Sequence, residues 1–134
     1  TQMAERLPGP DPRFTWNAPF EFVLHSSNAH GWPQIALALT NIDGTGAEQV
    51  LAYARCHVPL RSGAVTMDLP LMQTVQATPQ HKVFGALSGP PELRDLAFLC
   101  SAEDRVVMNA KRVPGHVRLA FNVAISDMGT LNYT

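Results

Sequence analysis

Charged side chains are scarce in this chain. Lysine, arginine, aspartate and glutamate make up 16% of its 134 residues, against about 25% in typical globular domains. The formal net charge is −1, so no overall field steers the chain toward nucleic acid or an anionic membrane, and any basic site has to be local. Aromatic residues interleaved with basic ones are also missing. The sequence therefore predicts no nucleic-acid partner.

Long apolar runs and cysteine frameworks are absent as well. No apolar run approaches the roughly 20 residues that a membrane-spanning helix needs, and no signal peptide is visible. The two cysteines, Cys56 and Cys100, form no C-x-x-C pair and show no zinc spacing with the five histidines. We expect free, partly buried thiols in a reduced, cytoplasmic setting.

Catalytic and cation-binding motifs are missing too. No G-x-S-x-G motif occurs, and Gly44-Thr45-Gly46 lacks the third glycine and the following helix of a phosphate-binding loop. A calcium site needs several oxygen donors around one ion, and no Asp-x-Asp pair occurs. The acidic candidates are scattered along the chain: Asp43, Asp68, Glu103 and Asp104. The sequence therefore predicts no enzyme, no cofactor and no metal.

Proline, in contrast, is abundant, with 11 residues where average usage is about 5%. Because proline breaks helix interiors, long helices are not expected. Alternation of apolar and other residues predicts short strands instead. The expected strands are Phe20–Leu24, Ile35–Leu39, Val50–Val58, Val65–Leu69, Leu96–Cys100, Arg105–Met108 and His116–Ile125.

The sequence also predicts where these strands end and where the chain turns between them. Asn41–Gly46 contains Asp-Gly and is the strongest turn signal, typical of a hairpin. Pro59 and Pro70 are expected to end the strands that precede them. The region Leu71–Pro91 has no period of two, and we expect a short helix within it, over Gln80–Leu87.

The chain divides into a lead-in and one domain. Residues 1–13 are polar and proline-rich and are expected to be an extended lead-in. Residues 14–134 carry the expected strands, and a segment of this length suits a single hydrophobic core. Short strands with turn signals about every 8–12 residues indicate an all-β fold, an antiparallel sandwich or barrel.

Four sequence blocks resemble the B9 domain family, small proteins of the ciliary transition zone that are linked to Meckel syndrome. The blocks are Trp16–Phe20, Ser27–Ile35 with Gly-Trp-Pro-Gln at its centre, Tyr53–Pro59 followed by Ser62-Gly63, and Phe121–Met128. The residues of this chain that match the family motifs are Trp16, Asn17, Pro19, Gly31, Trp32, Pro33, Gln34, Tyr53, His57, Val58, Pro59, Gly63, Phe121 and Asn122. The chain departs from the pattern at Ala52 and Ala54, where the family has glycine.

The resemblance implies a C2-like β-sandwich that works inside a complex and not as a catalyst. It implies a place at the cilium base, in the transition zone and basal body, and a role in ciliogenesis and in the diffusion barrier. The implied partners are the two sibling B9-domain proteins and transition-zone membrane proteins. Family members carry strands N-terminal to the Trp16 block, so we expect the parent protein to be longer.

The Gly-Trp-Pro motif also has a physical interpretation of its own. Pro33 favours an extended conformation at Trp32, and the indole of Trp32 is large enough to close the mouth of a sandwich. Fold maintenance is the expected role, and direct contact with a partner is the alternative. The same two interpretations apply to Trp16 and Phe121.

A membrane-binding module is the competing functional hypothesis. Arg55, His57 and Arg61 form a small basic group that suits anionic lipid or phosphoinositide, without calcium. The low charge content instead suits protein interfaces, whose cores are depleted of charged residues. Assembly with other proteins is therefore the leading hypothesis.

Overall fold

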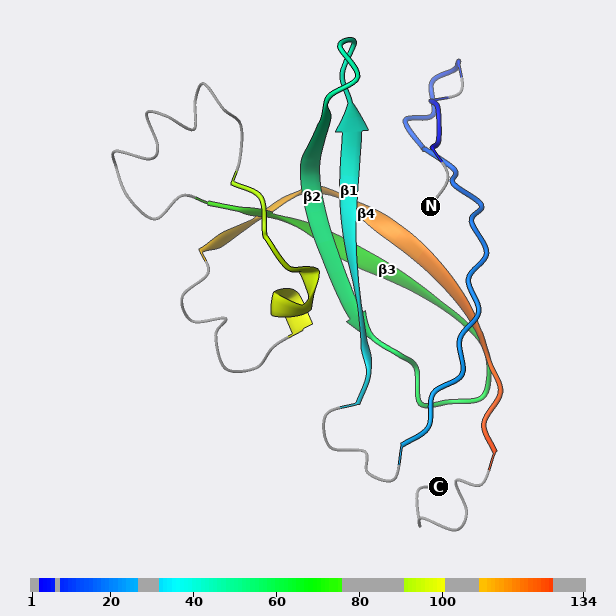
Figure 1. The fold of residues 1–134 in the computed structure, drawn as a ribbon. Coiled ribbons are helices and arrows are strands. Elements are labelled where there is room, and N and C mark those ends of the chain that lie inside the picture. Colours follow the sequence, from blue (N-terminus) through cyan, green and yellow to red (C-terminus); the bar gives the residue numbers. More distant parts are fainter. Residues whose placement is uncertain (1–2, 7, 27–31, 76–90, 101–108, 127–134) are drawn as a thin grey trace.

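The computed structural model describes residues 3–6, 8–26, 32–75, 91–100 and 109–126. Their elements, in chain order, are β1 (Gln34–Ile42), β2 (Glu48–His57), β3 (Gly63–Thr74), the 3₁₀ helix η1 (Leu96–Cys100) and β4 (Ala110–Val123). The strands form one antiparallel sheet in the order β1-β2-β3-β4 (Figure 1). The predicted all-β class is confirmed, while a second sheet, which a sandwich needs, is not present among the described residues.

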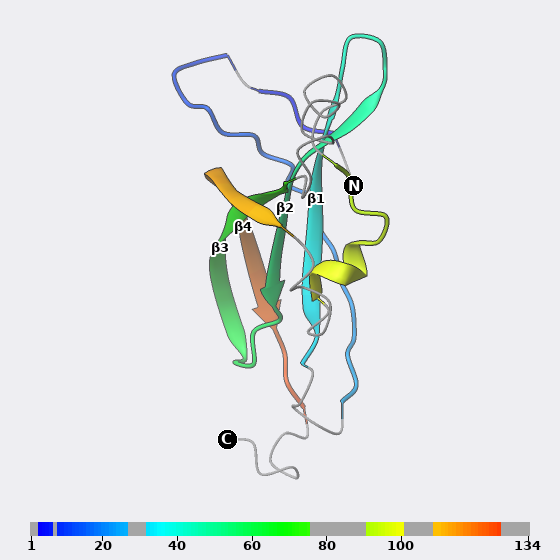
Figure 2. The same cartoon turned by 90° about the vertical axis from the view of Figure 1, so that its left-hand side faces the viewer.

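The sheet consists of two strand pairs that are joined at one position. β1 and β2 pair along the whole of β1, and β3 and β4 pair along the whole of β3. Between β2 and β3, the described residues show a single paired position, Tyr53 opposite Met72. The β1–β2 hairpin consequently lies across the β3–β4 pair (Figure 1), and Figure 2 shows β3 and β4 on one side with β1 and η1 on the other.

The hydrophobic core lies between these two strand pairs. Directly opposed residues of an antiparallel pair share one face, so alternate residues of each strand meet there. The buried members are Ala54, Cys56, Leu69 and Phe121, and the partly buried residues packed against them are Ile35, Leu37, Val65, Met67, Leu71, Leu119 and Val123. All four strands contribute, which confirms the period of two from which they were predicted.

The predicted hairpin turn between β1 and β2 is confirmed. Asp43 Oδ1 accepts hydrogen bonds from the backbone N–H groups of Thr45 at 2.8 Å and Ala47 at 3.0 Å. Gly46 has a φ of 85°, a conformation that favours glycine. The Thr45 hydroxyl also donates to this oxygen, at 2.5 Å. These hydrogen bonds, of which the one from the hydroxyl has the largest effect, hold the pKa of Asp43 below its ordinary value. Asp43 is therefore a turn residue whose carboxylate is engaged by its own loop.

Pro70 lies inside β3 and does not end it, so that prediction is wrong. The strand continues to Thr74. Opposite Pro70, β4 carries two extra residues, Pro114 and Gly115, where the register shifts. Such a bulge interrupts the ladder, and a proline that lacks an N–H is tolerated at that point. Beyond the bulge β4 extends back to Ala110, further than its alternation predicted.

The bulge gives the first testable prediction. Gly115 has a φ of 107°, and an added Cβ would lie 3.2 Å from Leu71 Cδ1. Gly115→Ala is expected to lower the free energy of unfolding by about 1–3 kcal/mol, the usual cost of such a conformation for other residues. Urea denaturation measures this loss. The matched control is Gly44→Ala, because no described atom beyond the neighbouring residues of the chain lies within 4 Å of that Cβ; equal losses in both variants would contradict the prediction.

The predicted strand Phe20–Leu24 is not a strand in the structure. Its described residues have no regular secondary structure. The Phe20 ring stacks on Phe22 at a centroid distance of 5.8 Å and meets Phe121 edge-on at 6.1 Å. The alternation of apolar residues in this segment therefore reflects contacts between aromatic rings, one of which belongs to the core residue Phe121. Such contacts can form without the backbone hydrogen bonds of a strand.

The predicted strand Leu96–Cys100 is the 3₁₀ helix η1. Asp95 starts this turn, since its Oδ1 accepts from the Ala97 N–H at 2.8 Å and its backbone carbonyl accepts from the Phe98 N–H at 3.3 Å. An aspartate before an apolar run is a helix-start signal that the sequence carried. The predicted helix Gln80–Leu87 and strand Arg105–Met108 lie outside the described residues.

In the part of the chain that the structure describes, no helix is long and apolar enough to cross a membrane.

Candidate functional site

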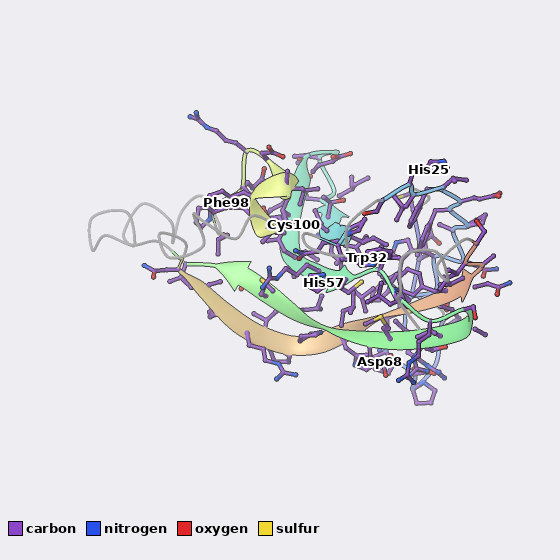
Figure 3. All side chains as sticks on the ribbon, turned by 90° about the horizontal axis from the view of Figure 1, so that it is seen from below. His25, Trp32, His57, Asp68, Phe98 and Cys100 are labelled. Carbon is purple, nitrogen blue, oxygen red and sulfur yellow. The ribbon has the colours of Figure 1, made fainter. Side chains whose placement is uncertain are left out.

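Trp32, labelled in Figure 3, lies just before β1, at the open end of the β1–β2 hairpin. Its indole Nε1 donates a hydrogen bond to the Val58 carbonyl at 2.8 Å. The Val58 N–H in turn donates to the Pro33 carbonyl at 3.0 Å. These two bonds join the residues before β1 to those after β2, so two blocks of the family motif meet here. Fold maintenance therefore stays the expected role of Trp32, and contact with a partner stays the alternative.

A strap, residues 91–100, covers the face of the β1–β2 hairpin that points away from the core. The sheet side chains bind backbone atoms of the strap: Thr74 Oγ1 donates to the Pro91 carbonyl, Tyr53 Oη accepts from the Leu93 N–H at 2.8 Å, Arg55 Nη1 donates to the Leu99 carbonyl at 2.8 Å, and Gln34 Nε2 donates to the Cys100 carbonyl at 3.3 Å. Glu92 Oε1 also accepts from the Val50 N–H at 3.2 Å. The strap thus crosses from β3 over β2 to β1.

The structure brings several predicted site residues together at this strap. Tyr53, 3% exposed, and the half-buried Gln34 hold it, and Leu99 of the strap is 1% exposed. The role of the strap was not predicted, because the pattern of Leu96–Cys100 indicated a strand of the sheet where the structure has η1. The family motif residues Tyr53 and Gln34 therefore serve contacts with a segment that lies far along the chain.

Other motif residues lie elsewhere. Phe121 belongs to the core, and its neighbour Asn122 is exposed on the opposite face of β4. Gly63 opens β3 with a φ of 110°. Pro59 is half-buried directly after Val58. Gly31 lies outside the described residues.

The Trp16 block lies in the N-terminal segment, apart from the strap and the hairpin end. Trp16 is 39% exposed and stacks on Phe14 at a centroid distance of 6.2 Å. Asn17 has a φ of 47°, a left-handed conformation that asparagine tolerates better than most residues. Pro19 is exposed. This block therefore lies at the surface.

The basic group predicted for lipid contact does not act as one unit. Arg55 is half-buried and its guanidinium donates to the Leu99 carbonyl at 2.8 Å. His57 and Arg61 are exposed. Arg55 thus holds the strap, and lipid contact by these three residues stays a prediction.

Both cysteines are free, as predicted. Cys56 belongs to the core, and burial raises the pKa of its thiol. Cys100 is half-buried at the end of the strap. Among the described residues, no group of three or more His, Cys, Asp or Glu side chains is placed to hold a metal ion.

An ion pair lies on the outer face of β3 and β4. Arg118 donates from Nε to Asp68 Oδ1 at 2.7 Å and from Nη2 to Asp68 Oδ2 at 2.9 Å. These hydrogen bonds hold the pKa of Asp68 below its ordinary value. Since a lowered folded-state pKa favours the folded state above the unfolded pKa, the pair's contribution is lost as pH falls through the folded-state pKa of Asp68.

Arg118→Gln is therefore expected to raise the pKa of Asp68 toward 3.8, its ordinary value. A carboxyl-carbon NMR titration of both proteins measures the change. Arg112→Gln removes another exposed arginine of β4, which lies opposite Met72, and is expected to leave the Asp68 titration unchanged. A titration that is the same in wild type and Arg118→Gln would show that the pair does not persist in solution.

Almost the whole chain matches one protein family. The family described as "Ciliary basal body-associated, B9 protein" matches residues 1–124. The chain therefore belongs to the B9 family of ciliary basal body-associated proteins. The match includes residues 1–13, which precede the resemblance read from the motifs.

The relatives are B9 domain-containing proteins 1 of several animals. The mouse protein is 31% identical over 99% of this chain and 65% of its own length, and the Xenopus laevis protein is 28% identical over 99% and 67%. The human protein is 33% identical over 88% of this chain and 58% of its own length. The chain thus spans about two thirds or less of the relatives it resembles. No solved structure matches it.

Proposed function

We propose that this chain is a non-enzymatic assembly module of the B9 complex at the ciliary transition zone, needed for ciliogenesis and for the diffusion barrier at the cilium base. The observation that carries the proposal is the family match over residues 1–124. The proposed partners are the two sibling B9-domain proteins, together with transition-zone membrane proteins.

The surface supports an assembly role. Apolar side chains of the N-terminal segment stay exposed: Phe14, Trp16, Phe20, Phe22 and Leu24 are between 39% and 52% exposed. Within this segment Phe14 stacks on Trp16 and Phe20 stacks on Phe22, and clustered exposed apolar side chains are typical of interaction sites. The scarcity of charge in the chain, 16% of residues, also suits protein interfaces.

Co-purification with the two sibling B9 proteins tests the proposal. We expect a stable complex whose mass, measured by size-exclusion chromatography with light scattering, corresponds to a defined stoichiometry. Circular dichroism of the isolated chain provides the control for folding. A well-folded monomer that remains separate from both siblings would overturn the assembly proposal.

The same result would favour the membrane-binding hypothesis, which liposome flotation tests directly. Vesicles with anionic lipid, with and without calcium, are the probe. The structure supports this hypothesis less, because the Arg55 guanidinium is engaged by the Leu99 carbonyl. We expect no flotation at physiological salt.

A further inference from the structure

We propose that Asp43 is a site of isoaspartate formation and that the turn between β1 and β2 suppresses this modification in the folded chain. Asp43-Gly44 is the one Asp-Gly pair of the sequence, and no Asn-Gly pair occurs. A glycine after the aspartate favours the reaction, because glycine has no side chain to hinder attack by its backbone nitrogen. The proposal does not rest on the ciliary role of the chain.

The reaction requires no reagent other than water. The Gly44 nitrogen attacks Cγ of the protonated Asp43 carboxyl group, a C–N bond forms, and water leaves with the carboxyl hydroxyl and the amide proton. A second water molecule then opens the succinimide ring. Addition of that water at Cγ restores aspartate. Addition at the α-carbonyl carbon gives isoaspartate, in which the backbone runs through the side chain of residue 43 and is longer by a methylene group.

The turn holds Asp43 by its backbone and by its side chain. The Asp43 N–H donates to the Ala47 carbonyl at 3.0 Å, and the Asp43 carbonyl accepts from the Gly46 N–H at 3.0 Å. Asp43 Oδ1 accepts from the Thr45 N–H at 2.8 Å, the Thr45 hydroxyl at 2.5 Å and the Ala47 N–H at 3.0 Å. Attack requires Cγ and the Gly44 nitrogen to come within bonding distance, which turns the side chain against the following peptide group. The hydrogen bonds of the turn oppose this rotation.

The same hydrogen bonds keep the carboxyl group ionised. The bond from the Thr45 hydroxyl has the largest effect in holding the pKa of Asp43 below its ordinary value. Only the protonated carboxyl can lose water on attack, because the ionised group has no comparable leaving group. The Thr45 hydroxyl therefore slows the reaction twice, through the conformation of Asp43 and through its protonation.

The turn is protected by its own hydrogen bonds and not by burial. Residues 41–49 are all exposed, and the turn extends beyond the rest of the sheet (Figure 1). A Cβ on Gly44 would have no described atom within 4 Å beyond the neighbouring residues of the chain. Exposed turns open locally with less free energy than global unfolding requires. Isoaspartate formation therefore depends on how often this turn opens.

The first test compares the folded chain with the same chain unfolded in guanidinium chloride, at one pH and temperature. Isoaspartate at residue 43 is quantified by liquid chromatography and mass spectrometry, since endoproteinase Asp-N does not cleave at isoaspartate. We expect formation at least about tenfold slower in the folded chain, which corresponds to about 1.4 kcal/mol. Gly44→Val is the control for the chemistry, because a β-branched residue hinders attack by its own nitrogen, and formation in its unfolded chain is expected to fall at least about fivefold.

The second test removes the hydroxyl that holds the carboxylate. Thr45→Val keeps the shape of the side chain and the backbone N–H, and formation in the folded chain is expected to rise about fivefold, which corresponds to about 1 kcal/mol. Thr45→Ser keeps a hydroxyl and is expected to restore the wild-type rate. Thr66→Val removes an exposed hydroxyl from β3, opposite Ala120, and is expected to change nothing. In guanidinium chloride all three variants are expected to react like wild type.

Three results would overturn the proposal. Absence of isoaspartate at residue 43 in the unfolded chain would show that Asp43 is not a modification site. Equal rates in the folded and unfolded wild-type chains would show that the turn does not suppress the reaction. Equal rates in wild type and Thr45→Val, both folded by circular dichroism, would show that the Thr45 hydroxyl does not protect Asp43.

Discussion

Replacing Phe121 with alanine is expected to lower the free energy of unfolding by about 3–5 kcal/mol, the usual cost of removing a buried aromatic ring. Phe121 is 8% exposed and belongs to the cluster in which the two strand pairs meet. Its ring also receives the edge contact of Phe20 at 6.1 Å. Urea denaturation followed by circular dichroism measures the loss.

Phe22→Ala is the control for this prediction. The Phe22 ring is 45% exposed and stacks on Phe20 outside the core. We expect a loss of about 0.5–1 kcal/mol, since exposed positions contribute little to stability. Similar losses in the two variants would mean that the core does not lie where the strand pairs cross.

The second large effect is expected at Trp32. Trp32→Ala removes a half-buried indole and its hydrogen bond to the Val58 carbonyl, at an expected cost of about 3 kcal/mol, near the lower end for aromatic truncation. Trp32→Phe keeps most of the ring and leaves the carbonyl without this donor, so we expect about 1 kcal/mol. Thermal unfolding monitored by circular dichroism ranks the three proteins.

Trp16→Ala separates this effect from the general loss of a tryptophan. Trp16 is 39% exposed and stacks on Phe14, so its removal is expected to change thermal unfolding little. Binding to the sibling B9 proteins is measured for both tryptophan variants. If Trp32→Ala kept its melting temperature and lost sibling binding, Trp32 would be a partner contact and not a residue that maintains the fold.

The strands were predictable because their patterns are local. Alternation along Ile35–Leu39 and Val50–Val58, with the Asp-Gly turn between them, specifies a hairpin from about 25 consecutive residues. The pattern at Phe20–Leu24 was equally regular, yet its rings contact each other and Phe121 without strand pairing. An alternating pattern of apolar residues shows which side chains can be buried on one face. It does not show whether a partner strand lies within hydrogen-bond distance.

The candidate site was only half predictable, for a different reason. The motif residues Gln34 and Tyr53 were identified, but their partners are backbone groups of Cys100 and Leu93, which lie 66 and 40 residues away in the chain. A backbone group carries no side-chain identity, so such a contact leaves no signal in either sequence segment. The bulge that accommodates Pro70 was not predicted for another reason: its residues, Pro114 and Gly115, lie on the opposite strand, and the sequence does not show that they face Pro70.

The position of the strap also has a consequence for how the chain reaches its native state. β1 and β2 are separated by five residues, 43–47, whereas residues 75–109 separate β3 from β4. The entropic cost of closing a loop grows with its length, and pairing between distant segments slows folding. The early hairpin offers the strap a place to dock, and docking of residues 91–100 divides the long connection into two shorter loops. With residues 91–100 docked, the expected entropic cost of pairing β4 with β3 is that of two shorter loops and not of one long loop.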